Sequence, residues 1–148
     1  APQVLRLLDY VIFNALIGNH DAHAKNFSLL YSGKAPVLAP SYDTLSTAAY
    51  PTMTQKMAMK IGSNYKFSEV QARHWEQFAE SVGLTKAQAK RRILELAKLL
   101  PANARKLQFA PERGFVGNAV VEQISTLIEH CCALTIRRLN VPATESSV

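Results

Sequence analysis

Apolar residues recur every three or four positions over the first 17 residues and over nearly everything after residue 67. Such spacing places them on one stripe of an amphipathic helix, which must face a core. Between these parts, residues 27–31 and 37–39 predict two short strands around a glycine-containing turn. A loop is expected from residue 40 to about residue 53. The predicted fold class is therefore mainly α, with a small β-hairpin.

Local signals predict where two of the helices begin and where one of them ends. Ser68 with Gln71 and Thr85 with Gln88 have the spacing of a capping box, in which two side chains satisfy each other's exposed backbone amides. A helix start is predicted at each place. The helix that follows Thr85 is expected to end at Pro101, because proline disrupts a helix interior.

A last long helix is predicted over residues 117–139. Residues 57–61 are either another strand or merely extended chain, and residues 62–66 are expected to be a polar connection.

At 148 residues the chain has the size of one domain. We expect that domain to span residues 1–141 and to be followed by a disordered tail over residues 142–148.

The composition is that of an ordinary globular protein, with 48% apolar and 19% charged residues. No secretory signal is visible, no run approaches the 18 or more apolar residues of a membrane span, and the adjacent Cys131 and Cys132 form no spaced disulfide framework. These features predict a soluble, cytoplasmic protein that does not associate with membranes.

The formal charge of +6 favours acidic partners. Much of it lies in three clusters, which are residues 86–92, Arg105 with Lys106, and Arg137 with Arg138. Solvated helix faces commonly look like this, and no groove-reading motif accompanies the charge. The solvated reading is favoured, while direct DNA contact stays open.

One short segment, residues 18–26 with the sequence Gly-Asn-His-Asp-Ala-His-Ala-Lys-Asn, is dense in polar and ionisable residues although both flanking elements are apolar. Loops of this kind on a packed scaffold are commonly functional. Asp21 and Asn26 have the spacing of the protein-kinase catalytic loop, where the aspartate accepts the substrate hydroxyl proton and the asparagine binds Mg²⁺. Asp43, after the hairpin, could return to the same metal.

Phosphoryl transfer from ATP needs hard cations held by oxygen ligands, together with a base that aligns the incoming hydroxyl. Asn26 and Asp43 offer the oxygens, and Asp21 is the candidate base. Lys25 and His23 could place positive or donor groups on the transferring phosphate. The predicted cofactors are ATP and Mg²⁺.

Two other readings of the same residues stay open. His20, Asp21 and His23 could bind Zn²⁺ or Mn²⁺ in a hydrolase or nuclease. Alternatively, Asp21 and Asn26 could be turn and cap residues, since both types bond their own backbone readily. His74, which lies in a helical pattern beside a tryptophan, is expected to be structural.

Residues 16–30 and 38–46 resemble the carboxy-terminal lobe of HipA-family toxin kinases, through the motifs Asp-x-His-x-Lys-Asn and Tyr-Asp. The resemblance implies a protein-kinase-like lobe that transfers the ATP γ-phosphate to a protein serine or threonine. By position, Asp21 is then the catalytic base, Asn26 and Asp43 hold Mg²⁺, and His23 and Tyr42 lie near the nucleotide. Looser likeness covers nearly the whole chain.

The resemblance also implies partners that this sequence does not contain. It implies an amino-terminal lobe with a phosphate-covering loop, and no glycine-rich loop of that kind occurs here. The chain alone is therefore expected to transfer phosphate negligibly. Further implied partners are a DNA-binding antitoxin and a protein substrate such as an aminoacyl-tRNA synthetase. The competing hypothesis is a catalytically silent helical module that binds protein or nucleic acid.

Overall fold

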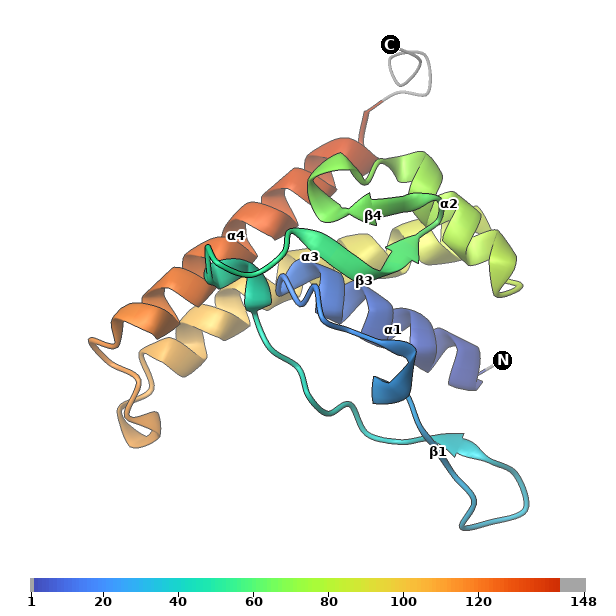
Figure 1. Cartoon of the computed structure of the whole chain (residues 1–148), viewed down its shortest axis with the longest axis horizontal. Helices are drawn as coiled ribbons and strands as arrows, with labels where there is room; N and C mark the ends of the chain where they lie inside the picture. The colour runs from blue at the N-terminus through green and yellow to red at the C-terminus, as the bar shows by residue number, and fades with distance from the viewer. Residues whose placement is uncertain (1, 142–148) are drawn as a thin grey trace.

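The computed structural model describes residues 2–141, and within them the chain forms four α-helices and two β-hairpins (Figure 1). The helices are α1 (Pro2–Leu16), α2 (Ala72–Ser81), α3 (Lys86–Gln108) and α4 (Ala119–Leu139). The hairpins pair β1 (Leu29–Leu30) with β2 (Val37–Leu38), and β3 (Lys56–Ile61) with β4 (Asn64–Lys66), both antiparallel. The mainly helical fold with a small hairpin is confirmed. The tail predicted over residues 142–148 lies outside the described residues.

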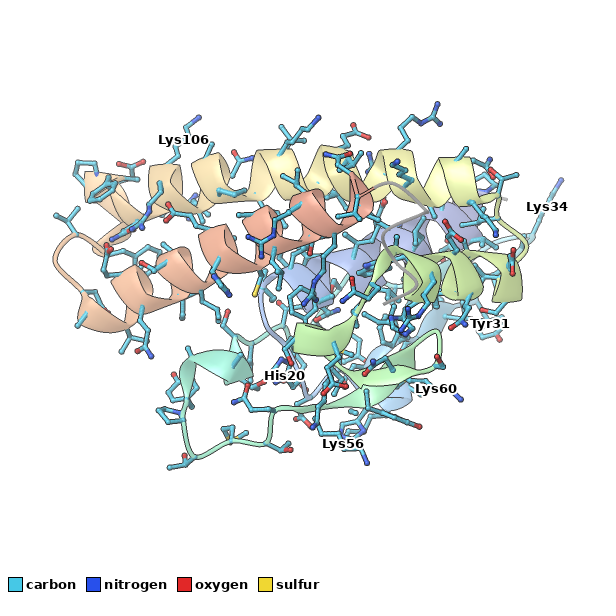
Figure 2. The ribbon with its side chains drawn as sticks, turned by 90° about the horizontal axis from the view of Figure 1, so that it is seen from above. His20, Tyr31, Lys34, Lys56, Lys60 and Lys106 are labelled. Carbon is cyan, nitrogen blue, oxygen red and sulfur yellow. The ribbon has the colours of Figure 1, made fainter. Side chains whose placement is uncertain are left out.

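The core lies where α1 meets the long helices α3 and α4, which run side by side (Figure 2). Leu8, Ile12 and Leu16 are fully buried, and their spacing of four places them on one stripe of α1. Ile93 of α3 and Cys132 of α4 are the other large side chains buried to the same degree. Burial raises the pKa of the Cys132 thiol to about 12, so this cysteine is a packed apolar group.

An ion pair fixes α1 against α3. The Arg92 guanidinium donates to both carboxylate oxygens of Asp9, with Nε–Oδ1 at 2.5 Å and Nη2–Oδ2 at 2.8 Å. This two-bond geometry is the strong form of an arginine–carboxylate contact. It holds the helix that precedes the polar segment in a defined orientation.

Two predicted helix boundaries are wrong. Ser68 lies in a 3₁₀ turn, and α2 instead begins after Gln71, whose backbone N–H donates to His74 Nδ1 over 2.8 Å. The helix after Thr85 does not end at Pro101 but continues to Gln108. Its final turns are held against α4 by Arg105, which donates to carboxylates of that helix, so tertiary contacts override the local effect of proline. The Thr85–Gln88 capping box is confirmed in both directions.

Two further elements differ from expectation. Residues 64–66, predicted to be a polar connection, form strand β4, and this pairing makes a strand of residues 56–61. The α4 helix is also long and apolar enough to cross a membrane by length and composition alone, contrary to the sequence prediction. That is weak support for a span, because a core helix passes the same test, and α4 bears carboxylates that bond Arg105 of α3.

Candidate active site

The polar segment begins at a glycine that no other residue could replace without strain. Gly18 follows α1 with φ +72°, a conformation that L side chains rarely adopt. A Cβ at this position would lie 2.9 Å from Ala48 Cβ and 3.0 Å from Leu127 Cδ2. The chain can therefore turn tightly here while packing against the loop after Asp43 and against α4.

A buried amide network then fixes the backbone around Asp21. The Asn19 side chain is buried and donates to Asn14 Oδ1 over 2.8 Å, while its own Oδ1 accepts from the Asp21 backbone N–H over 3.1 Å. Asn14, also buried, donates to the Tyr10 carbonyl. The Asn19 amide further lies 3.4 Å from the Asp43 carbonyl oxygen. Asn19 thus links α1, the candidate base and the second carboxylate segment.

The structure brings Asn26 and Asp43 into direct contact. The Asn26 side-chain amide donates to Asp43 Oδ2 over 2.8 Å, and Asn26 Oδ1 accepts from the His23 backbone N–H over 3.0 Å. The His23 ring reaches the other way, with Nε2 2.8 Å from Asp21 Oδ1. Asp21, His23, Asn26 and Asp43 consequently form one continuous chain of contacts on an exposed surface.

Tyr42 connects the loop that contains Asp43 to residues 25–28. Its hydroxyl donates to the Lys25 carbonyl over 2.9 Å and lies 2.9 Å from Ser28 Oγ. The neighbouring Asp43 has φ +55°, the one non-glycine residue with positive φ among residues 2–141. The Lys25 side chain is exposed and makes no ion pair with any described residue.

The loop after Asp43 returns to the start of the polar segment. Thr47 is buried, and its hydroxyl accepts from the His20 backbone N–H over 2.9 Å and donates to the Gly18 carbonyl over 3.2 Å. The Ala48 N–H donates to the same carbonyl over 3.0 Å. Gln123 of α4 donates to the Ala49 carbonyl over 2.6 Å, so the long helix holds this loop in place.

The donor set fits a hard divalent cation better than zinc. Asn26 and Asp43 offer three side-chain oxygens, the ligand type that Mg²⁺ takes together with phosphate and water. No group of three or more His, Cys, Asp or Glu side chains able to hold a metal occurs among residues 2–141. His20 in particular is buried, with Nδ1 3.3 Å from the Thr54 carbonyl oxygen, while His23 faces Asp21. The geometry does not favour the zinc hypothesis.

Several side chains of the three basic clusters make ion pairs or hydrogen bonds within the molecule. Lys86 pairs with Glu76 and Glu80, and the Arg105 guanidinium pairs with Glu122 and Glu129 of α4, which raises the pKa of Arg105 above its ordinary value. Arg138 donates to three backbone carbonyls, those of Phe67, Ser68 and Val70. These contacts favour the solvated and structural reading of the charge over a nucleic-acid footprint.

Sequence reasoning did not single out Asn14, Asn19 or Thr47. The signal available for Asn14 was a polar residue on the apolar stripe of the first helix, since buried amides are retained only where they are bonded. Thr47 gave no such signal, because its partners lie 27 and 29 positions away.

The chain is similar to proteins of one known family over most of its length. The family model described as HipA-like C-terminal domain matches residues 1–104. A Sinorhizobium fredii protein named "Putative kinase Y4mE" is 49% identical over 96 residues, covering 65% of this chain and 23% of that protein. The serine/threonine-protein kinase toxin HipA of Shewanella oneidensis is 28% identical over 95 residues, covering 64% of this chain and 22% of that protein.

The fold is also found in a solved structure, that of the Shewanella oneidensis HipA, HipB and operator DNA complex. The match has a TM-score of 0.78 at 23% sequence identity and covers 90% of this chain and 32% of the matched chain. At that identity the likeness shows the fold alone. The chain spans less than a quarter of the length of the two relatives named above.

Proposed function

Because this chain belongs to the HipA-like C-terminal domain family, we propose that it is the metal- and base-bearing lobe of a serine/threonine protein kinase. The observation that supports this most is the contact chain from Asp21 through His23 and Asn26 to Asp43. It joins residues with the spacing of a kinase catalytic loop to the second carboxylate that a metal site requires.

In the proposed reaction Asp21 accepts the proton of the acceptor hydroxyl while that oxygen bonds to the γ-phosphorus of ATP. The bond between the γ-phosphorus and the bridging oxygen breaks, and ADP leaves. The His23 ring, 2.8 Å from Asp21, holds the carboxylate in position. Lys25, exposed and without an acidic partner among the described residues, is available to the transferring phosphate.

Asn26 and Asp43 are the residues that would hold Mg²⁺, which supplies neutralisation of the phosphate charge during transfer. The hydrogen bond between them keeps the two donors together before any ligand arrives. The Tyr42 hydroxyl stabilises the same arrangement from the side, through the Lys25 carbonyl and Ser28. Tyr42 and His23 are accordingly proposed to lie beside the bound nucleotide.

The activity of the whole kinase requires parts that lie outside this sequence. We propose an amino-terminal lobe that covers the ATP phosphates, since this chain spans only 22–23% of the two relatives named above. The solved complex, whose name includes HipA, HipB and operator DNA, supports a DNA-binding antitoxin as a proposed partner. On the family resemblance alone, we also propose a cytoplasmic location and a protein substrate such as an aminoacyl-tRNA synthetase.

The decisive experiment uses Asp21→Asn in a longer protein that joins this chain to its amino-terminal lobe. Autophosphorylation and ATP hydrolysis are expected to fall by at least about 100-fold, because the carboxylate base is lost while the shape is kept. Glu112→Gln, an equivalent change at an exposed acid in the turn between α3 and α4, should leave both rates unchanged. Normal phosphotransfer by the Asp21→Asn variant would show that Asp21 is not the catalytic base.

The competing hypothesis, a catalytically silent interaction module, makes the opposite prediction. Under it, binding of DNA or protein survives Asp21→Asn, and the longer protein does not hydrolyse ATP even with aspartate at this position. Lys86, Arg105 and Arg138 already make ion pairs or hydrogen bonds within the molecule. These contacts give little support to a module that binds nucleic acid.

A further inference from the structure

A cavity of about 140 Å³ opens between α1, the polar segment, β3 and α2. Most of its wall is apolar, and the side chains that form this part are Val11, Phe27, Met57, Met59, Ile61 and Phe78. Cavities of about 150 Å³ lined by apolar side chains can hold a molecule as large as benzene. The volume is therefore sufficient for one apolar side chain. We call this the Met57/Met59 cavity.

The cavity lies beside the candidate base. Asn19, His20 and Ala22, which flank Asp21 in sequence on both sides, also line it. The Ala58 N–H of β3 donates to the His20 carbonyl over 2.7 Å, so the strand that forms one wall is tied to the polar segment. A polypeptide that presents a hydroxyl to Asp21 must therefore pass close to the cavity.

The spacing of an extended chain suggests which residue of that polypeptide reaches the cavity. In a strand, side chains two positions apart point to the same face and lie roughly 7 Å apart. A side chain two residues before or after the phosphorylated serine or threonine therefore faces the same surface as the hydroxyl. Met57 and Met59 suit an apolar side chain of variable shape, because methionine is flexible and polarizable.

The rim of the cavity adds a charge. Lys60 lines it, is exposed, and pairs with no acidic side chain among residues 2–141. Figure 2 shows Lys60 and Lys56 projecting outward from the β3 region. Lys56 lies over the Tyr65 ring, 5.0 Å from its centroid, and does not line the cavity, so Lys60 is the lysine among the lining residues. An acidic residue on the passing polypeptide would complement it.

We propose that the Met57/Met59 cavity binds an apolar side chain of the acceptor protein, two residues from the phosphorylated serine or threonine, with an acidic residue of the same segment facing Lys60. This inference rests on the proposed kinase function for the identity of the ligand. It names the substrate class: a serine or threonine in an extended segment with apolar and acidic neighbours.

The first test measures binding without ATP. The chain has three methionines, so methyl-labelled methionine gives three NMR signals, from Met53, Met57 and Met59. Two peptides serve as probes, with leucine two residues before or two residues after a serine and a glutamate beside the leucine. At least one should shift the Met57 and Met59 signals and leave Met53, which does not line the cavity, unmoved.

The matched peptides with alanine in place of leucine should produce no such shift. Equal shifts with leucine and alanine, or no shift with either leucine peptide, would overturn the proposal. So would a shift that depends on protein concentration alone, which means that a second copy of the chain covers the cavity. A shift caused by adding the amino-terminal lobe, with loss of the peptide response, would identify an internal interface and equally overturn it.

The second test changes the rim charge. Lys60→Glu should reverse the preference between peptides that carry glutamate and those that carry lysine beside the leucine, a change of at least 10-fold in the ratio of affinities. Lys34→Glu, at an exposed lysine of the β1–β2 turn that does not line the cavity and is drawn apart from Lys60 in Figure 2, should leave the ratio unaltered. An unchanged ratio in Lys60→Glu would remove Lys60 from the site. Neither test requires phosphotransfer, so failure of the kinase proposal at Asp21 is a separate outcome.

Discussion

The Asn26 side-chain amide donates a hydrogen bond of 2.8 Å to the carboxylate of Asp43, which lies 17 positions later in the chain. This contact joins the two residues that are proposed to hold Mg²⁺. Two loops create it, one that follows α1 and begins at Gly18, and one that follows β2. The second loop returns to the Gly18 carbonyl through the Thr47 hydroxyl and the Ala48 N–H.

Asp43→Asn removes the negative charge at this position and is expected to leave the fold intact. Asparagine can still accept from Asn26 and tolerates positive φ, so the free energy of unfolding should change by less than about 0.5 kcal/mol. Phosphotransfer by the longer kinase should fall by about 100-fold or more and should require higher Mg²⁺ concentration. Steady-state rates across a Mg²⁺ titration test this, and a wild-type Mg²⁺ dependence would exclude Asp43 as a ligand.

Asn19→Ala should destabilise the fold although it removes no apolar contact. The change leaves the buried Asn14 Oδ1 and the part-buried Asp21 N–H without their hydrogen-bond partner, which costs roughly 1–3 kcal/mol. Urea unfolding of the 148-residue chain measures the loss. Asn103→Ala, at an exposed asparagine of α3, is the matched control and should change stability by less than about 0.5 kcal/mol. Equal effects of the two changes would contradict the network.

Gly62→Ala tests the close approach of the β3–β4 turn to α2. Gly62 has φ +58°, and a Cβ there would lie 2.5 Å from the His74 carbonyl oxygen. Backbone strain and this clash together should lower stability by at least about 2 kcal/mol. Gly83→Ala also places alanine at positive φ, +76°, but meets nothing within 4 Å, so its cost should be only about 1 kcal/mol. Thermal melts that give equal losses would show that the turn does not pack on α2 as described.

His74 should make stability depend on pH. Burial first, and then the charges of Arg73 and Arg138, lower the pKa of His74 below its ordinary value. The unfolded chain therefore binds a proton that the folded chain resists, so stability is fully present above about pH 6.5 and falls as pH drops below that value. Protonation also removes the Nδ1 lone pair that accepts from Gln71. His74→Gln should flatten the decline between about pH 6.5 and 5, as measured by urea midpoints. A decline of unchanged slope would assign it to other groups.

The sequence predictions that agree with the structure concern residues that are close in the chain or that belong to a recognised motif. The Thr85–Gln88 capping box joins residues three apart, and its spacing alone sufficed. The proximity of Asn26 to Asp43 followed from the order of two motifs around a hairpin, and the structure has it. The metal-binding and catalytic roles assigned to these residues stay predictions.

Where the two differ, the deciding contact comes from a distant part of the chain. Ser68 had the spacing of a cap, but Arg138, 70 positions later, holds its carbonyl, and His74 takes the capping role. Pro101 was expected to end a helix that Arg105 instead anchors to α4. Strand β4 depends on a partner strand whose own prediction was ambiguous. No local rule contains such information.

The left-handed backbone at Asp43 has an evolutionary consequence. Glycine would relax this position, so a lineage selected for folding alone should drift from aspartate towards glycine. Such a replacement would remove the carboxylate and leave Asn26 without its partner. The residue found at this position in homologous chains should therefore distinguish lineages that keep the proposed metal-binding carboxylate from those that keep only the fold.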